Sequence, residues 1–373
     1  MSAKVYGAAV HGAGDVSIQH ARGYLNNPHT KLVAISSKRE ESARKLAEAV
    51  GLRDVKIYTD YEKLLNDSEV DVISICTPQQ LHSGEVVKAA QAGKHILIEK
   101  PAAINLAGLS AMRDAVKKAR VKTVVGFVLR WNSIIETVKN LLSKRFFGDI
   151  YYVEADYQSH AWEPVLERWE WMRRNESGVS PFLIAGVHAI DISRWLAEPR
   201  PNKAANIVEV VSYSGGYRKD KILPPFEHDV MRYTGHSGKG TLVPPLEYDG
   251  LELALVKFAN GAVGKISTNF DVIMPYNFMW EIYGDRGTCK NNQVWSNEFI
   301  GQTDWISLEG HMPNSAAVGT HPFQPEIDHL ISCIIEDKES HANLEDAANT
   351  HETAFAALIS RQQGNRPVHL PLT

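Results

Sequence analysis

Two apolar segments of strand length, each ending in polar and turn-forming residues, constrain the fold of this chain more than any other feature. The first runs from Val72 to Ile75 and continues into Cys76-Thr77-Pro78. The second runs from His95 to Ile98 and continues into Glu99-Lys100-Pro101, and a helical segment near residues 82–92 separates the two. Strands that alternate with helices in this way form parallel sheets, which bind ligands beyond the carboxyl ends of the strands. The polar residues at both strand ends are therefore candidates for a ligand site.

The first third of the chain repeats this alternation of strand and helix. Apolar runs predict strands at residues 5–10, 31–35, 70–75, 95–98 and 123–127, with helices between them. Short connections between such elements imply right-handed crossovers and a doubly wound sheet. We therefore expect an α/β fold class, with a Rossmann dinucleotide-binding domain over residues 1–126.

After about residue 126 the pattern changes to strand-like runs with hairpin signals. Strands are expected at residues 150–158, 208–213, 251–259, 262–270 and 279–283, and helices near residues 134–144, 183–196 and 324–335. Asn260-Gly261, between two of these strands, is typical of a hairpin turn. Two Pro-Pro pairs within residues 213–247 predict a long loop or insertion. Residues 127–373 are therefore expected to form an α+β domain built on a large, mostly antiparallel sheet.

Composition argues against several classes of protein. A chain of 373 residues suits two domains, and its net charge of −4 without a sustained basic stripe argues against a nucleic-acid partner. No segment approaches the roughly 18 apolar residues of a membrane span, and no cleavable signal precedes the first apolar run. The three cysteines lie far apart, without metal-ligand spacing or a disulfide framework. We expect a cytoplasmic protein with no membrane partner and no metal site.

The turn after the first strand has the spacing of a dinucleotide-binding loop. In Gly12-x-Gly14, the first glycine permits the tight turn and the second lets the backbone approach a pyrophosphate. Asp15 and Val16 open the helix that follows, whose free N–H groups and positive dipole end suit a phosphate. Ser17 stands where a third glycine or alanine is usual, and a plain tight turn is the structural alternative.

The end of the second strand bears on the choice between NAD and NADP. An NAD site usually has a carboxylate here for the ribose hydroxyls, whereas this chain has Ser36-Ser37-Lys38-Arg39. No acid repels a 2′-phosphate, two hydroxyls can donate to it, and two cations can neutralise it. These residues favour NADP over NAD as the cofactor. A capping box formed by Ser37 and Glu40 is the structural interpretation, and both can hold together.

Lys100 is the candidate for acid–base chemistry. Pro101 fixes its own φ, lacks a donor and restricts the preceding residue, so the backbone sets the direction of the lysine. Beside a nicotinamide, an ammonium can hydrogen-bond a substrate hydroxyl and stabilise the developing alkoxide. Partial desolvation would lower its pKa toward a working range. The alternative is a solvated surface charge, which is the commoner role of an isolated lysine at a strand end.

Further candidates lie in the second half of the chain. His188 and Asp191 are three residues apart on one face of a predicted helix, and a packed or capping histidine is the alternative to a catalytic one. Aromatic faces pack on sugar rings, which makes His160 and Trp162 candidates for a carbohydrate-facing wall. Core packing or a subunit contact is the alternative for the tryptophan. Arg130 is a candidate on position alone, because it follows the last strand of the first domain.

Taken in order, these motifs closely resemble those of the Gfo/Idh/MocA oxidoreductase family over essentially the whole chain. The resemblance is carried by the Gly12-x-Gly14 turn with His20, by Thr77-Pro78-x-x-x-His82, by Gly93-Lys94-His95-x-x-x-Glu99-Lys100-Pro101, by Gly126-Phe127-x-x-Arg130-Trp131-Asn132 and by Gly186-x-His188-x-x-Asp191. The Glu-Lys-Pro element with its preceding Gly-Lys-His is highly specific.

The resemblance implies a Rossmann domain followed by an α/β domain whose open sheet commonly packs against another subunit, so we expect a homo-oligomer, either a dimer or a tetramer. It implies that Lys100 contacts both nicotinamide and substrate and that His188 is the usual acid–base residue. The same motifs place a further set of residues in the cofactor site: Cys76, Thr77, Pro78, His82, Glu99 and Pro101.

One position departs from the family pattern. Many members carry an aspartate four residues before the helix histidine, and this chain has Ile184 there, which can neither accept a proton nor hold a hydroxyl. Either Lys100 and His188 suffice, or another group such as Asp191 or Tyr157 assists.

We therefore expect an NAD(P)-dependent oxidoreductase that transfers a hydride between nicotinamide and a carbinol or keto carbon of a sugar, glycoside or cyclitol. Lys100 would orient the substrate oxygen and His188 would carry the proton. The other residues expected to contact substrate are Arg130, Tyr157, His160, Trp162 and Asp191. One alternative is a redox-neutral lyase or glycosidase that retains its NAD(P) and oxidises a sugar carbon transiently. The other is a non-catalytic nucleotide-sensing regulator, which only the loss of the aspartate at residue 184 supports.

Overall fold

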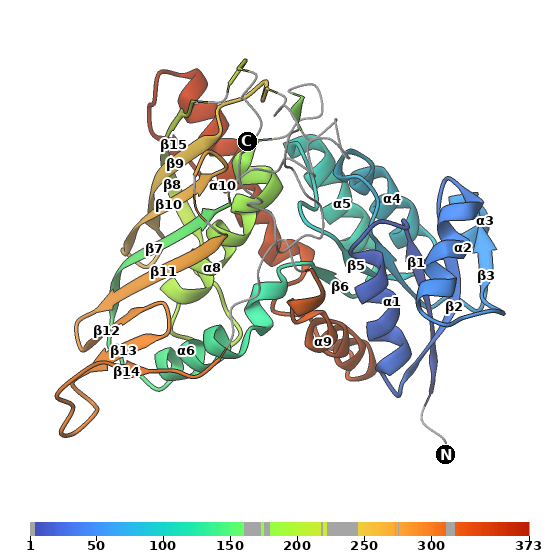
Figure 1. Cartoon of the computed structure of the whole chain (residues 1–373), viewed down its shortest axis with the longest axis horizontal. Coiled ribbons are helices and arrows are strands. Elements are labelled where there is room, and N and C mark those ends of the chain that lie inside the picture. Colours follow the sequence, from blue (N-terminus) through green and yellow to red (C-terminus); the bar gives the residue numbers. More distant parts are fainter. Residues whose placement is uncertain are drawn as a thin grey trace. The chain divides into compact units, whose positions relative to one another are not determined.

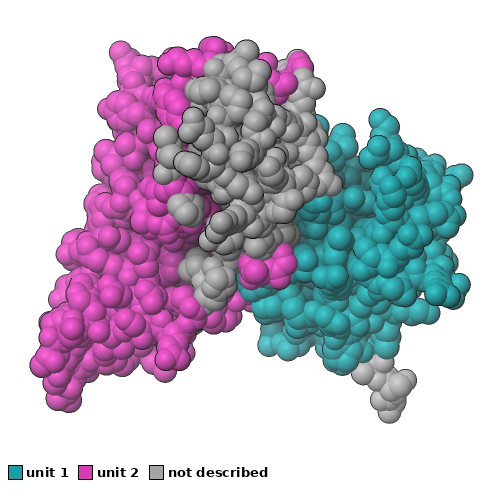
Figure 2. All heavy atoms as spheres, viewed as in Figure 1, with its two compact units in different colours: residues 1–128, 321–348 teal, residues 129–320, 349–373 magenta. Residues whose placement is uncertain are grey.

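Figure 1 shows a computed structural model of the chain. The residues that the structure describes are 4–159, 173–174, 180–217, 219–221, 245–272, 274, 276–310 and 318–372. The chain divides into two compact units, one of residues 1–128 and 321–348 and one of residues 129–320 and 349–373 (Figure 2). The first unit thus includes residues 321–348, a segment expected in the second domain.

The first unit is built on a parallel sheet of six strands. These are β1 (Tyr6–His11), β2 (Thr30–Ser36), β3 (Lys56–Tyr58), β4 (Val72–Ile75), β5 (His95–Ile98) and β6 (Thr123–Val125). Their spatial order is β3-β2-β1-β4-β5-β6, and neighbouring strands are parallel. The chain reverses its direction of winding between β1 and β4, which is where doubly wound sheets bind ligands. The prediction of a Rossmann-type sheet is confirmed.

Helices accompany this sheet. They are α1 (Ser17–Asn26), α2 (Glu40–Ala49), α3 (Tyr61–Leu65), α4 (Gln79–Gln91), α5 (Leu106–Ala119) and α9 (Phe323–Ile335). All four residues of β4 are buried, as expected for a strand covered on both faces. The chain returns to this unit through α9, which packs closely on α1 because Gly23 has no side chain. A Cβ there would lie 2.2 Å from Cδ1 of Ile327.

The second unit is built on a sheet of nine strands. They are β7 (Ile150–Gln158), β8 (Ile207–Gly215), β9 (Leu251–Phe258), β10 (Val263–Asn269), β11 (Asn277–Gly284), β12 (Gly287–Lys290), β13 (Gln293–Ser296), β14 (Ile306–Ser307) and β15 (Val368–His369). Their order is β14-β13-β12-β11-β7-β10-β9-β8-β15. β10 and β7 are parallel, and the other neighbours are antiparallel. The prediction of a large, mostly antiparallel sheet is confirmed.

Helices pack on one face of the nine-stranded sheet. Figure 1 shows α8 (Val187–Ala197) and α10 (Leu344–Gln362) along that face. A π-helical turn, η4 (Phe182–Gly186), leads directly into α8. Within the described residues, the remaining elements are α6 (Ser133–Ser143) and two short 3₁₀ helices, η1 (Val128–Trp131) and η5 (Val318–Thr320). No helix in the described parts of the chain has the length and apolarity needed to span a membrane.

Two local predictions differ from the structure. The proposed capping box is wrong, because α2 begins at Glu40 and its N-cap is Arg39, without any side-chain capping hydrogen bond. Ser37 is therefore not engaged as a cap. Of the long loop expected over residues 213–247, the start belongs to β8, and residues 222–244 lie outside the described residues.

Candidate active site

The loop after β1 presents an open backbone surface at Gly14. Gly12 has a φ of +103°, and a Cβ there would lie 2.5 Å from the carbonyl oxygen of Cys76, so the turn requires glycine. A Cβ at Gly14, in contrast, would meet no atom within 4 Å. Oγ of the buried Ser17 accepts a hydrogen bond of 3.1 Å from the Gly14 N–H, which closes the turn and accounts for a serine at the third position.

The start of α1 adds the other part of a phosphate site. The N-cap of this helix is Val16, whose side chain makes no capping hydrogen bond. Asp15 is exposed and Val16 is half-buried. A helix N-terminus whose N-cap residue is apolar, next to an open glycine, fits the pyrophosphate of a dinucleotide.

At the end of β2, only some of the predicted cofactor residues are accessible. Ser36 is buried, and its Oγ lies 3.0 Å from Nδ1 of His11. Ser37 is half-buried, whereas Lys38 and Arg39 are exposed. The structure thus directs Ser36 into the protein and leaves the following three residues at the surface.

A polar network that sequence reasoning missed joins the ends of β1, β2 and β4. Nε2 of His11 lies 3.1 Å from Oε1 of Glu85, and the Thr77 hydroxyl donates to the other oxygen of Glu85. Burial would raise the pKa of Glu85, but His11 and Thr77 lower it overall. No local pattern marks Glu85, because its partners come from two separate strand ends.

His82 connects two of the loops that border this site. Its Nε2 lies 2.8 Å from the carbonyl oxygen of Thr77, and its Nδ1 lies 2.8 Å from that of Pro101. The imidazole is buried, while Thr77 is half-buried and Pro78 is exposed. His82 therefore fixes the loops after β4 and β5 to each other, and this geometry favours a structural role over the cofactor contact expected from the sequence.

Lys100 is the second residue after β5 and is half-buried, and its peptide bond to the buried Pro101 is cis. Oε2 of the neighbouring Glu99 accepts a hydrogen bond of 3.1 Å from the Lys100 N–H. Burial lowers the pKa of the Lys100 amine, Glu99 raises it, and the net shift is downward. The amine is therefore closer to the range in which a lysine can exchange protons with a substrate.

In the second unit, the structure brings together two predicted substrate residues. His188 is the second residue of α8, and Tyr157 lies on β7 with its ring nearly parallel to the imidazole, at 13° and a centroid separation of 6.3 Å. Thr268 on β10 pairs in register with Tyr157. A Cβ at Gly186 would lie 2.1 Å from Oγ1 of Thr268, so glycine allows the start of α8 to lie close to the sheet. Ile184, in the preceding π-helical turn, is buried.

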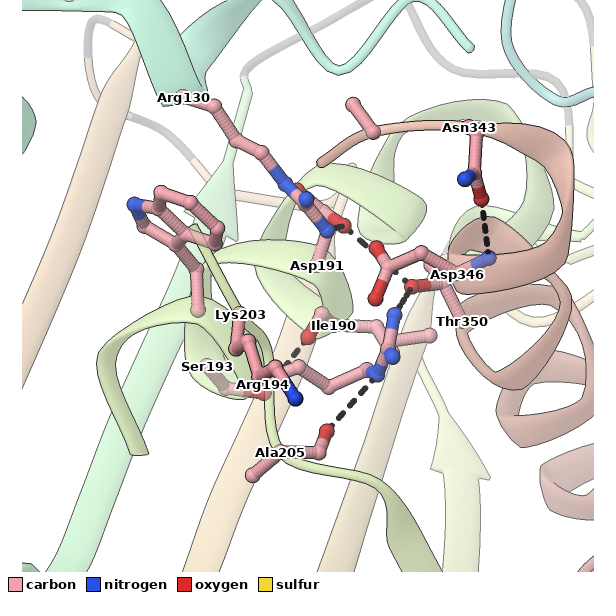
Figure 3. Close-up of polar contacts among 12 residues, drawn as sticks. Arg130, Ile190, Asp191, Ser193, Arg194, Lys203, Ala205, Asn343, Asp346 and Thr350 are labelled. Atoms are coloured by element: carbon pink, nitrogen blue, oxygen red, sulfur yellow. Dashed lines mark hydrogen bonds and ion pairs between the residues drawn. The ribbon is translucent and has the colours of Figure 1, made fainter. Parts of the chain in front are cut away.

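Asp191 and Arg130 occupy the interior of the second unit (Figure 3). Nε and Nη2 of Arg130 donate hydrogen bonds of 2.8 and 2.5 Å to the two carboxylate oxygens of Asp191. Beside them, Nη1 of Arg194 donates to the Thr350 hydroxyl at 2.7 Å. Because Arg130 is 1% exposed and Asp191 is fully buried, this geometry favours a structural role over the substrate contact expected from the sequence.

Two of the predicted substrate residues lie in a part of the chain that the structure does not describe. His160 and Trp162 lie outside the described residues. Lys100 belongs to the first unit and His188 to the second. No group of three or more His, Cys, Asp or Glu side chains within the described ranges could hold a metal ion.

Both units match models of one protein family. Residues 6–127 match the model described as oxidoreductase family, NAD-binding Rossmann fold. Residues 139–370 match the model of the C-terminal alpha/beta domain of the same family.

Individual relatives agree with this assignment. The chain is 26% identical to myo-inositol 2-dehydrogenase of Thermotoga maritima over 276 residues, which are 74% of this chain and 72% of that protein. It is 24% identical to scyllo-inositol 2-dehydrogenase (NAD(+)) of Bacillus subtilis over 372 residues, which are 97% and 95% of the two chains. The solved structure of scyllo-inositol dehydrogenase from Lactobacillus casei has a TM-score of 0.74 at 18% identity and covers 98% of this chain and 99% of that one, a likeness of fold. The chain belongs to the Gfo/Idh/MocA family of NAD-binding oxidoreductases.

Proposed function

We propose that this protein is an NAD(P)-dependent dehydrogenase or reductase that acts on a CH–OH group of a sugar, glycoside or cyclitol. The observation that carries the proposal is the position of Lys100, which follows β5 in the same sheet whose first loop exposes Gly14. The names of the inositol dehydrogenases among its relatives support a polyhydroxylated substrate.

In this proposal Lys100 and His188 have different roles at the substrate hydroxyl. The Lys100 amine hydrogen-bonds the substrate oxygen and stabilises the negative charge that develops there as the C–H bond breaks. His188 accepts the hydroxyl proton during oxidation and returns it during reduction. The Tyr157 ring lies nearly parallel to the imidazole with its centroid 6.3 Å away, so its hydroxyl is a candidate to assist at a site with Ile184 in place of the usual aspartate. A bound NAD(P) supplies the carbon that exchanges the hydride.

A panel of sugars and cyclitols, assayed with NAD and with NADP, tests this function. Net formation or consumption of NAD(P)H with one class of substrate is the expected result. Turnover by enzyme that keeps its nucleotide, without net reduction, would instead support a redox-neutral lyase or glycosidase. Cofactor-dependent binding to another protein, with no turnover on the panel, would support a regulator.

We further propose that NADP is preferred over NAD. The support is the surface position of Ser37, Lys38 and Arg39 at the end of β2, where no carboxylate stands to repel a 2′-phosphate. The NAD(+) in the name of the Bacillus subtilis relative points the other way. Calorimetric titration of the full chain with each nucleotide distinguishes the two, and tighter binding of NAD would overturn this preference.

We also propose that a second copy packs on the face of the nine-stranded sheet opposite α8. Leu255 and Val263 project from adjacent strands on that face and are 53% and 45% exposed, which leaves apolar area without cover in the single chain. Light scattering that gives the mass of a monomer would overturn this.

The free, buried cysteines suit a reducing compartment, and we place the protein in the cytoplasm.

A further inference from the structure

Three ionisable side chains lie buried near Lys100, and the reaction described above uses none of them. They are His20 on α1, Glu99 at the end of β5 and Glu326 on α9, and their exposed fractions are 0%, 7% and 0%. Burying an ionised group is costly unless it is paired with an opposite charge. Each of these three groups is therefore expected to be either paired or neutral.

His20 and Glu99 form a pair that is fixed on both sides. Nε2 of His20 lies 2.9 Å from Oε1 of Glu99, and its Nδ1 lies 3.0 Å from Oγ of Ser74, which is 2.8 Å from the Tyr24 hydroxyl. Burial would lower the pKa of His20, but Cys76 and Glu99 raise it well above its usual value. Burial would raise the pKa of Glu99, but His20 lowers it overall. These opposite shifts favour the charged form of both partners, an imidazolium beside a carboxylate.

Glu99 also contacts Lys100 through its second oxygen. Oε2 accepts the Lys100 N–H at 3.1 Å, so the carboxylate that His20 anchors also fixes the backbone of the lysine. The Glu99 carboxylate also packs close to the backbone of Gly126, where an added Cβ would lie 3.4 Å from the carboxylate atoms. The charge of Glu99 raises the pKa of the Lys100 amine and so opposes the effect of burial.

Glu326 differs from Glu99 although both are buried carboxyl groups. Neither of its oxygens has a hydrogen-bond partner among the residues that the structure describes. Burial, and then the charge of Glu99, raises its pKa well above the usual value. A negative charge on Glu99 opposes ionisation of Glu326 in the same low-dielectric interior, so the surroundings favour the ionised form of Glu99 and the neutral form of Glu326.

We propose that Glu99, anchored by His20, is a positioning residue that fixes Lys100 and keeps its amine protonated, and that Glu326 has no part in this. The proposal rests on the proposed function only in taking the Lys100 amine as the working group. Among the described residues, other ionisable side chains that act on this cluster include Tyr24, Cys76 and His82.

Two variants with the same chemical change test the proposal: Glu99→Gln and Glu326→Gln. The readout is the pH dependence of labelling of Lys100 by an amine-reactive reagent, followed by peptide mass spectrometry on the full chain without substrate. We expect Glu99→Gln to lower the apparent pKa of Lys100 by about one pH unit or more, as removal of a neighbouring opposite charge does. Glu326→Gln should leave it unchanged. Equal results for the two variants would overturn the proposal.

Activity separates this inference from the proposed function. In Glu99→Gln, the pH profile of kcat/KM should move in the same direction as the labelling. If the labelling moves and the activity profile does not, the positioning role stands and the assignment of Lys100 as the working amine fails.

A measurement on the unaltered chain covers the case in which Glu99→Gln does not fold. Nitrogen-15 spectra of the histidine side chains, with His20 assigned through His20→Gln, report the protonation of each imidazole. We expect His20 to carry protons on both nitrogens at pH 8. A neutral His20 at that pH would remove the ion pair and with it the proposal.

Discussion

Arg130 and Asp191 are 61 residues apart in sequence and form a bidentate ion pair inside the second unit. Since the carboxylate lies on α8 and the guanidinium on η1, the pair fixes the helix that carries His188. A buried pair of this kind depends on both partners, because either charge alone in the interior is strongly unfavourable.

Asp191→Ala should destabilise the protein by about 3–5 kcal/mol, because it breaks a buried ion pair and removes the acceptors of two hydrogen bonds from the Arg130 guanidinium. Urea unfolding, followed by circular dichroism, measures the change in the free energy of unfolding. The matched control is Asp149→Ala, which removes an exposed partner of Arg145, in a pair whose side chains are 79% and 49% exposed. An exposed pair contributes little, so the control should unfold like the wild type. A similar loss in both variants would contradict this account.

Gly12→Ala and Gly14→Ala should have different effects, although they lie two residues apart. The first places a Cβ 2.5 Å from a carbonyl oxygen at a φ of +103°, so we expect a lower melting temperature. The second adds a methyl group in open space, so the melting temperature should not change. The methyl group would instead obstruct a pyrophosphate, and we expect the Kd for NAD(P) to rise by about tenfold or more. Unchanged nucleotide binding by Gly14→Ala in calorimetric titration would exclude this loop from the site.

Lys38→Ala should weaken binding of NADP while leaving NAD nearly unaffected. A charged hydrogen bond to a phosphate contributes about 1.5–3 kcal/mol, which predicts a rise of roughly tenfold or more in the Kd for NADP. Lys45→Ala serves as the control, because Lys45 is an exposed residue of α2 that pairs with Glu41. Equal weakening for the two nucleotides would show that Lys38 does not contact a 2′-phosphate.

Glu326→Gln should stabilise the protein, and more so as the pH rises. The folded state raises the pKa of this carboxyl well above 4.5, so the unfolded chain loses the proton first. Folding is therefore opposed more strongly as the pH rises from about 4.5 toward the folded-state pKa, by about 1.4 kcal/mol per pH unit. Melting temperatures of variant and wild type should coincide near pH 4 and separate at pH 7–8. A constant difference over this range would contradict a neutral Glu326.

Lys100→Met should reduce turnover by about 100-fold or more, since it removes the amine proposed to act on the substrate oxygen. The folded state should persist, and NAD(P) should still bind. Lys118→Met, at the exposed end of α5, is the control that keeps normal turnover. Near-normal turnover in the Lys100 variant would refute the role of the amine.

The sequence predicted those elements whose apolar periodicity is long enough to detect. The ranges of β5 and β7 agree with the structure residue for residue. β3, β12, β13, β14 and β15 were not predicted, since strands of two to four residues that are not part of a continuous apolar run show no detectable pattern. Helix α10 was missed because polar residues such as Thr350 and His351 are buried in it, which removes the contrast between an apolar and a polar face.

The candidate site was predictable where it depends on local motifs. Gly12 and Gly14 have the geometry that their spacing implies, and Lys100 follows the expected strand. Partnerships between distant residues were not predictable. His11 and Glu85 are 74 residues apart, and no periodicity connects them. Asp191 illustrates the same limit. Its position on a helix face suggests a ligand contact, but in the structure it pairs with Arg130 from another element.

The return of residues 321–348 to the first unit has a practical consequence for recombinant work. The backbone of Val125 at the edge of β6 donates to the Ala342 carbonyl, and Thr123 accepts from the Leu344 N–H. A gene fragment that stops at residue 128 would encode a Rossmann sheet with one strand unprotected and the apolar flank of α1 bare. Anyone who wants the nucleotide-binding half alone should splice residues 321–348 onto its carboxyl end through a designed linker.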